Sequence, residues 1–238
     1  MRSPYGLELT GSCERCLLKS EGFFCNLSQI TLKALDGIKF MNGYPKGAVL
    51  FVEEEAPRGI FVLCKGRVKL SMTSSEGKTM ILRIVHPGEV LGLHAVMSNQ
   101  PYQASAETLE ACQVNFVRRE DFLRFLSQHA EASLCAARQL SRSYQSACEQ
   151  VRSLGLTRSA SAKLARFLLD SSQTGQDTRQ GVRIRMTMTH EEIGQLIGSS
   201  RETVTRALGE FKSKRLVAID GSVLLIPNRA ALQSAAGV

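Results

Sequence analysis

The stretch THEEIGQLIGSSRETVTRALGEFK constrains the fold more than any other part of the chain. Thr189 with Glu192, and Ser199 with Glu202, each form an S/T-x-x-E pattern, in which a hydroxyl caps the free N–H groups of a helix and the glutamate caps in return. The two predicted helix starts lie ten residues apart, and Gly198 between them can take the backbone conformation that ends the first helix. This spacing predicts two short helices joined by a tight turn.

The second of these helices presents polar side chains near its N-terminal end. Val204, Leu208 and Phe211 recur at helical spacing and predict its buried face. An ordinary capped helical corner with a solvated charged face is one interpretation. The other is a helix that meets base edges and phosphates in a DNA major groove. The candidate DNA-binding residues are Ser199, Ser200, Arg201, Glu202, Thr203, Thr205 and Arg206.

The segment GSSRETVTR (198–206) resembles the recognition-helix signature of the CRP/FNR family of bacterial transcription regulators, and the resemblance extends over nearly the whole chain. It implies an α+β fold with an N-terminal cyclic-nucleotide-binding-like β-roll, a long dimerisation helix and a C-terminal winged helix-turn-helix. The expected parts are a cysteine arm (1–28), a sensory roll (29–128), the dimerisation helix (129–154) and the DNA-binding domain (155–238).

The resemblance also implies partners and residue roles. A homodimer would bind a palindromic, TGA-containing site in double-stranded DNA and work with RNA polymerase. Arg206 would contact guanine, and Glu202 would accept from amino groups of cytosine or adenine. Arg201 matches an arginine that CRP-like members use for an additional G·C pair, whereas Thr205 matches a hydroxyl that FNR-like members use for a T·A pair. Finding both together leaves the outer half-site open between TGTGA-like and TTGA-like sequences.

Composition agrees with a two-domain globular protein that has a polyanionic partner. The chain has 238 residues, enough for two cores, and a net charge of +8. It contains no run of about 18 apolar residues, and its N-terminus has no basic segment followed by an apolar one, so we expect neither a membrane span nor a signal peptide. The expected location is the cytoplasm, without a membrane partner.

Periodicity places the remaining elements. A short helix capped at Ser28 is expected over 28–40, and glycine-separated β-rich runs between about 39 and 118 predict a compact antiparallel roll. Helix is expected over 119–154 and again over 156–169, followed by a polar loop (171–181) and a strand at VRIRMTM. Asp220-Gly221 predicts a hairpin turn after the helix-turn-helix.

An apolar seam on the long helix predicts pairing with a second copy. Its members follow a 4,3,4,3 spacing, which suits one helix against its twin. The alternatives are a second, more polar phase that includes Cys148, and a single helix packing on its own roll. The predicted dimer-interface residues are Leu140, Tyr144, Ala147, Cys148 and Val151, and the seam continues to Leu154.

Seven cysteines in a chain with no predicted export signal indicate metal or redox chemistry rather than a disulfide framework. Cys13 and Cys16 have C-x2-C spacing, and Cys25 follows after eight residues, which suits zinc or an iron–sulfur cluster. A zinc site, a dithiol switch or uncommitted cysteines remain alternatives. Cys64, Cys135 and Cys148 are interpreted as ordinary strand or helix residues.

The family resemblance supplies a fourth ligand. The segment ETLEAC (107–112) resembles the place where the oxygen-sensing FNR branch carries its fourth cluster cysteine. By this resemblance Cys13, Cys16, Cys25 and Cys112 would hold a [4Fe–4S] cluster, although the gap between Cys16 and Cys25 is longer than in the best-known member. Control by a thiol switch, by haem on His94 or by an unidentified small molecule is the alternative within the same family.

Other ligands and activities find less support. Cyclic AMP binders of the family use a glutamate and an arginine, for which this chain has Leu93 and Gln103, so we expect no cyclic AMP binding. The histidines show no H-x-H or H-E-x-x-H pattern that would favour a metal-dependent, cupin-like enzyme. We therefore expect a regulator without enzymatic activity.

Overall fold

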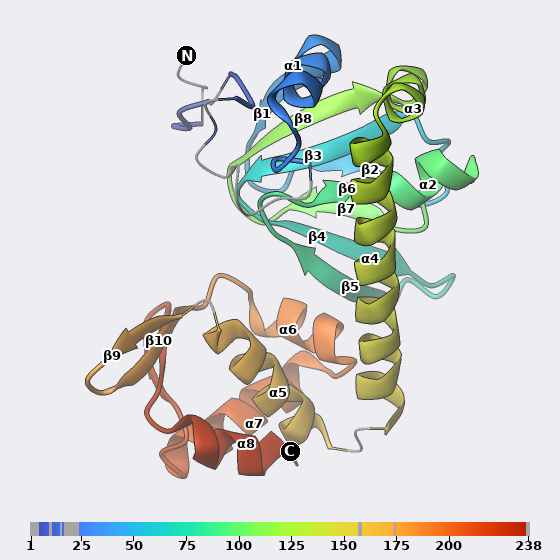
Figure 1. Ribbon diagram of the computed structural model, residues 1–238. Helices are drawn as coiled ribbons and strands as arrows, with labels where there is room; N and C mark the ends of the chain where they lie inside the picture. Colours follow the sequence, from blue (N-terminus) through green and yellow to red (C-terminus); the bar gives the residue numbers. More distant parts are fainter. Residues whose placement is uncertain are drawn as a thin grey trace. The chain divides into compact units, whose positions relative to one another are not determined.

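A computed structural model describes residues 5–9, 11–14, 16, 24–156, 159–173 and 175–236. The chain divides into two compact units, 1–146 and 147–238 (Figure 1). Much of the predicted cysteine arm lies outside the described residues, as does the side chain of Leu154. No helix in the described part of the chain is long and apolar enough to cross a membrane.

The first unit contains a roll of two four-stranded antiparallel sheets (Figure 1). The first sheet has the order β1 (Lys39–Tyr44), β8 (Cys112–Arg118), β3 (Gly59–Lys65) and β6 (Val90–Leu91). The second has the order β2 (Val49–Phe51), β7 (Ser105–Thr108), β4 (Val68–Thr73) and β5 (Thr79–Val85). The predicted roll, and with it the fold class, is confirmed.

Side chains alternate between the two faces of the first sheet, and both faces are buried. One face packs against Phe51, Val68 and other residues of the second sheet in the interior of the roll. The opposite face packs against helices, with Leu32 of one helix and Phe122 of another in the same core. This two-sided burial explains why β3 is apolar over most of its length.

Four helices accompany the roll: α1 (Gln29–Ile38), α2 (Leu93–Ser98), α3 (Arg119–Gln128) and α4 (Ala130–Leu156). Ser28 caps α1 by accepting from the N–H of Thr31, as predicted. Glu131, in the first turn of α4, accepts hydrogen bonds from the N–H of Ser28 at 3.0 Å and from the hydroxyls of Ser28 and Thr31. Further along α4, the buried amide of Gln139 donates to the carbonyl of Val90 at 2.6 Å. These bonds fix the first half of α4 on the roll.

The second unit surrounds its own core with helices and a small sheet. The sheet order is β11 (Ala218–Asp220), β12 (Val223–Ile226), β10 (Gly181–Arg185) and β9 (Gln176–Thr178). The helices are α5 (Ala160–Ser172), α6 (His190–Ile197), α7 (Arg201–Ser213) and α8 (Arg229–Ala236). Asp220 pairs with Val223 around Gly221, which has φ 56°, so the predicted hairpin is confirmed.

Candidate DNA-binding helix and cysteine cavity

Helices α6 and α7 form the predicted helix-turn-helix. Thr189 caps α6 through a capping box with Glu192, whose carboxylate accepts from the Thr189 N–H at 2.8 Å. Gly198 ends α6 with φ 66°, a left-handed conformation that glycine takes without strain. Gly194, on the buried side of α6, lies against the turn: a Cβ there would be 2.7 Å from the carbonyl oxygen of Ser199. The two helices can cross this closely because Gly194 has no side chain.

The start of α7 corrects one prediction. Ser200, rather than Ser199, is the N-cap, and its hydroxyl accepts from the N–H of Thr203 at 3.2 Å. Ser199 still belongs to the turn, since its N–H donates to the carbonyl of Gly194 at 2.8 Å. The predicted cap was therefore one residue too early, because the bond to Gly194 extends the turn.

The predicted DNA-binding side chains lie on one accessible side of α7. Its opposite face is buried and consists of Val204, Ala207, Leu208 and Phe211. Ser200, Arg201, Glu202, Thr205 and Arg206 are exposed, whereas Ser199 and Thr203 are half-buried. Hydrogen bonds from its own N–H and from Ser200 lower the pKa of Glu202, so this carboxylate is ionised and can accept from a base amino group.

Thr205 has hydrogen bonds within the protein that the sequence did not predict. Its hydroxyl lies 2.9 Å from Nδ1 of His190 and donates to the carbonyl of Arg201 at 2.9 Å. His190 is thereby placed beside the candidate DNA-binding residues. Its position as the first residue of α6, opposite the first turns of α7, is a tertiary feature without a local sequence signal.

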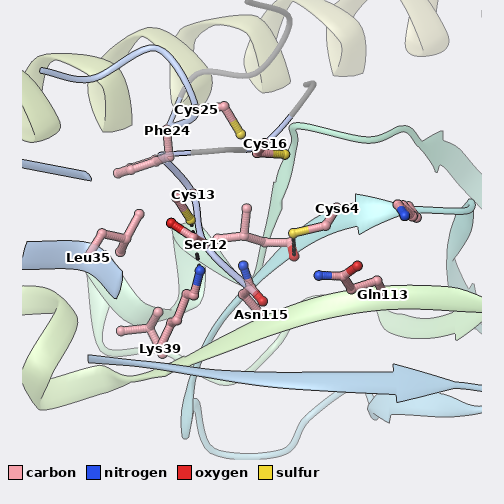
Figure 2. Close-up of a pocket in the computed structure, with 13 residues that line it drawn as sticks. Ser12, Cys13, Cys16, Phe24, Cys25, Leu35, Lys39, Cys64, Gln113 and Asn115 are labelled. Carbon is pink, nitrogen blue, oxygen red and sulfur yellow. Dashed lines mark hydrogen bonds between the residues drawn. The ribbon is translucent and has the colours of Figure 1, made fainter. Parts of the chain in front are cut away.

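A cavity of about 200 Å³ lies between the cysteine arm and the first sheet of the roll (Figure 2). Cys13, Cys16 and Cys25 line it from the arm, and Cys64 of β3 lies beside them. Lys39 and other residues complete the wall: Ser12, Phe24, Leu35, Val62, Lys65, Gln113, Asn115 and Val117. The structure thus brings together three of the four predicted ligands and adds a cysteine that the sequence analysis had left aside.

An ion pair anchors Cys13 to the end of α1. The ammonium of Lys39 lies 2.5 Å from the carboxylate of Asp36 and donates to Sγ of Cys13 at 3.0 Å. Asp36 in turn accepts from the Cys13 N–H at 3.1 Å. Burial lowers the pKa of Lys39, but the bonds to Asp36 and Cys13 outweigh burial and leave that pKa raised. A cation therefore stays beside the cysteines at neutral pH.

Burial favours the protonated form of Cys13, Cys25 and Cys64 at neutral pH. Burial raises the pKa of Cys13 to about 12 and that of Cys25 to about 11. Burial also raises the pKa of Cys64 to about 12, with further increases from Cys25, Cys13 and Cys16, so Cys64 lies within electrostatic range of the three arm thiols. A metal would bind here with release of protons, because thiolates are the ligands.

Cys112 does not line this cavity. It is fully buried in the interior of the roll, where its thiol donates to the carbonyls of Glu110 at 3.2 Å and Arg67 at 3.4 Å. Along β8, Cys112 and Val114 face the interior, whereas Gln113 and Asn115 face the cavity. The predicted ligand set of Cys13, Cys16, Cys25 and Cys112 therefore does not fit this geometry.

The cavity thiols also do not surround a single point. Within the described residues, no group of three or more His, Cys, Asp or Glu side chains is arranged to hold a metal ion. Four thiols that border a void of this size fit a polynuclear cluster better than one ion. The donor set with Cys64 is compatible with an iron–sulfur group, and the set with Cys112 is not.

The predicted dimer residues lie along α4 and differ in exposure. Tyr144 is 73% exposed and Val151 is 71% exposed, and Ala147 and Cys148 are also exposed. Leu140 is half-buried and packs against the core between the first sheet and the helices. The seam therefore begins against the roll and continues onto an accessible apolar surface.

The two roll positions considered for nucleotide binding carry no charge. Leu93 is buried in the core beside the helices, and the exposed amide of Gln103 lies 3.3 Å from Nε2 of His94. Neither side chain can supply the charge-assisted bonds that a cyclic phosphate and its ribose would need at these places.

Comparisons with known proteins agree with this architecture. Residues 42–129 match the cyclic nucleotide-binding domain, and residues 162–235 match the Crp-like helix-turn-helix domain. The CRP-like cAMP-activated global transcriptional regulator of Mycobacterium tuberculosis is 26% identical over 212 residues, 88% of this chain and 94% of that one. The anaerobic regulatory protein of Bacillus subtilis is 22% identical over 201 residues, 84% of each. The solved structure of TTHB099, a CRP-family transcriptional regulator from Thermus thermophilus, has a TM-score of 0.71 and 25% identity, covering 83% of this chain and 97% of that one.

The fold and the exposed helix define a DNA-binding transcription regulator of the helix-turn-helix class. More narrowly, the chain belongs to the CRP/FNR family. The relatives that it matches are transcription regulators rather than enzymes.

Proposed function

We propose that this protein is a cytoplasmic, homodimeric regulator that binds a palindromic, TGA-containing DNA site under control of oxygen or redox state through a [4Fe–4S] cluster. The observation that carries this proposal is the cavity in which the three arm cysteines meet a fourth thiol on the sensory roll. The similarity to a protein named as an anaerobic regulatory protein also supports control by oxygen or redox state. When bound, the cluster would supply sensitivity to oxygen, and the arm cysteines would hold it against the roll.

The exposed N-terminal turns of α7 would carry the sequence readout. Arg206 can present two parallel N–H donors to O6 and N7 of a guanine, and Glu202 can accept from an amino group. Because Thr205 already donates to the Arg201 carbonyl, it would offer its methyl group or lone pairs rather than a free O–H. In this proposal the DNA-bound dimer controls transcription through contacts with RNA polymerase.

The proposal excludes cyclic AMP as the effector, although one relative is named for activation by it. A cyclic phosphate would lose charge-assisted bonds worth about 1.5 to 3 kcal/mol each where Leu93 and Gln103 stand in for charged groups. The cavity beside the arm, rather than the interior of the roll, is then the place of sensing.

The proposal is tested by selecting DNA from a random library with protein purified without oxygen. We expect a palindrome with TGA in each half-site, tight binding before exposure to air, and binding weakened by at least about tenfold, or 1.4 kcal/mol, afterwards. Cyclic AMP should leave both affinities unchanged. A DNA affinity that stays the same after exposure to air and increases with cyclic AMP would contradict the proposed control. A selected consensus sequence without a palindrome or without TGA would contradict the proposed site.

Dimerisation through α4 gives a separate prediction. Two substitutions together, Tyr144→Lys and Val151→Lys, would place like charges along a surface that we expect to meet its own copy, so the double variant should be monomeric at micromolar concentration. Light scattering should give the 26.1 kDa of one chain instead of twice that mass.

Glu149→Lys is the matched control. Glu149 is exposed on α4 but lies away from the line through Tyr144 and Val151, so its variant should remain dimeric. A monomeric wild-type protein, or a double variant that keeps the dimer mass, would show that α4 does not form the interface.

A further inference from the structure

We propose that Cys64 on strand β3, and not Cys112, is the fourth thiolate beside Cys13, Cys16 and Cys25, so that the iron–sulfur cluster joins the arm directly to the outer face of the first sheet. This inference rests on the proposed cluster and names its ligands. It departs from the ligand set that the family resemblance implied.

The two faces of the first sheet separate the two candidate cysteines. On β3, Ile60 and Val62 pack in the core beside the helices, and Cys64 lies at the cavity, where a bulge interrupts the pairing of β3 with β8. On β8, Cys112 points to the opposite side, into the interior of the roll. To reach the cavity, Cys112 would have to give up its pairing with Tyr44 at the end of β8, or the whole strand would have to shift by one residue, which would turn every one of its side chains to the other face.

The register of β8 is strongly held against such a shift. Its pairs with β1 run from Lys39–Val117 to Tyr44–Cys112 without interruption. A shift would place Gln113 and Asn115 in the apolar interior, and Val114 and Phe116 outside it. Cys112 also packs closely at its own site, since a Cβ on Gly66 would lie 2.5 Å from its sulfur.

The cavity is larger than a single metal ion would need. Its volume of about 200 Å³ exceeds the roughly 150 Å³ of an engineered protein cavity that binds benzene. A single zinc ion would need no such void, because Zn–S bonds of about 2.3 Å bring four sulfurs nearly into contact around the metal. The void among the four thiols therefore favours a group with several metal atoms.

The charge in the cavity also fits. A cluster with a 2+ core and four thiolates has a net charge of about −2, and the side chains of Lys39 and Lys65 both line the wall.

Binding of Cys64 to iron needs no oxidant or reductant. Each of the four thiols loses its proton as its sulfur bonds to an iron of a preassembled cluster, and the thiolate that held that iron leaves as a thiol with a proton. The iron and sulfide come from that cluster.

The test compares Cys64→Ala with Cys112→Ala in the full-length protein, purified and reconstituted without oxygen. Wild type and Cys112→Ala should each bind about four iron and four sulfide per subunit. Cys64→Ala should lose more than about 100-fold in cluster affinity, beyond the 10- to 100-fold typical of outer-shell changes. Circular dichroism of each variant checks that the fold is retained.

A second measurement does not depend on the variants. In wild-type protein, alkylation followed by mass spectrometry should show Cys13, Cys16, Cys25 and Cys64 protected while the cluster is bound and labelled after a chelator removes it. Cys64 is only partly buried without a cluster, so it can react. If Cys64 reacts equally in both states, it is not a ligand and the inference fails.

The outcomes separate the inference from the proposed function. A cluster that survives Cys64→Ala and is lost in Cys112→Ala would overturn the inference and leave the proposed function standing, as would a cluster retained by both variants. Wild-type protein that binds neither iron nor sulfide, or that binds zinc instead, would overturn both.

Discussion

Replacing Arg206 with alanine should weaken binding to the selected palindrome by about 1 to 3 kcal/mol per half-site contact, or roughly 5- to 150-fold, and leave binding to random DNA almost unchanged. Arg206 is exposed on α7, and the removed group would be a bidentate donor to guanine. Binding should be measured at one fixed salt concentration, because phosphate contacts make affinity depend on salt.

Arg179→Ala is the control for loss of charge alone. Arg179 is also exposed in the second unit but lies in the turn between β9 and β10. Its variant should show at most the small, sequence-independent loss expected for one cation. If Arg206→Ala weakens binding to random DNA as much as to the palindrome, Arg206 contacts only phosphate.

Replacing Gly194 with alanine should abolish detectable specific binding while the roll stays folded. The new Cβ would lie 2.7 Å from the carbonyl oxygen of Ser199 and 3.3 Å from the carbonyl carbon of Ser200, both of them backbone atoms at the start of α7. Backbone cannot move aside as a flexible side chain can, so α7 must shift relative to α6. We expect a cost of about 1 to 3 kcal/mol in the stability of the second unit, as for overpacking.

Gly209→Ala provides the matched control. Gly209 lies in α7, and a Cβ at this position would meet no atom within 4 Å. Alanine is favoured over glycine in a helix interior by about 1 kcal/mol, so this variant should raise the unfolding temperature of the second unit and preserve its fold. Thermal unfolding and DNA binding together decide the matter: normal specific binding by Gly194→Ala would show that the turn tolerates the displacement.

Features with a local physical cause were predictable from the sequence. The capping box at Thr189, the cap at Ser28, the turn at Gly198 and the hairpin at Gly221 each depend on a few adjacent residues, and the structure contains all of them. Two elements were missed. Strand β9 has no such signal, because it is polar and entirely exposed inside the expected loop. Helix α8 does have one that the sequence analysis overlooked: Oδ1 of Asn228 accepts from the N–H groups of Ala230 at 2.9 Å and Ala231 at 3.2 Å, as an N-cap does.

The cysteine site shows a different limit. Spacing was sufficient to group Cys13, Cys16 and Cys25, because they lie in one short segment. Resemblance then assigned Cys112 as the partner, although its alternation with Gln113 and Asn115 already set it apart from the polar side of the strand. The position of Cys64 depends on the pairing of β3 with β8, which brings residues about 50 positions apart side by side and has no local sequence signal.

The hydrogen bonds of Glu131 limit how far Cys25, the last cysteine of the arm, can move. Cys25 lies only three positions before Ser28, whose N–H is bonded to Glu131 at the start of α4. A fully extended chain covers about 3.3 to 3.6 Å per residue, so the segment from Cys25 to Ser28 spans at most about 11 Å. Any larger displacement of Cys25 must first pull Ser28 away from Glu131, and a wide opening of the arm is therefore mechanically tied to the first turn of α4.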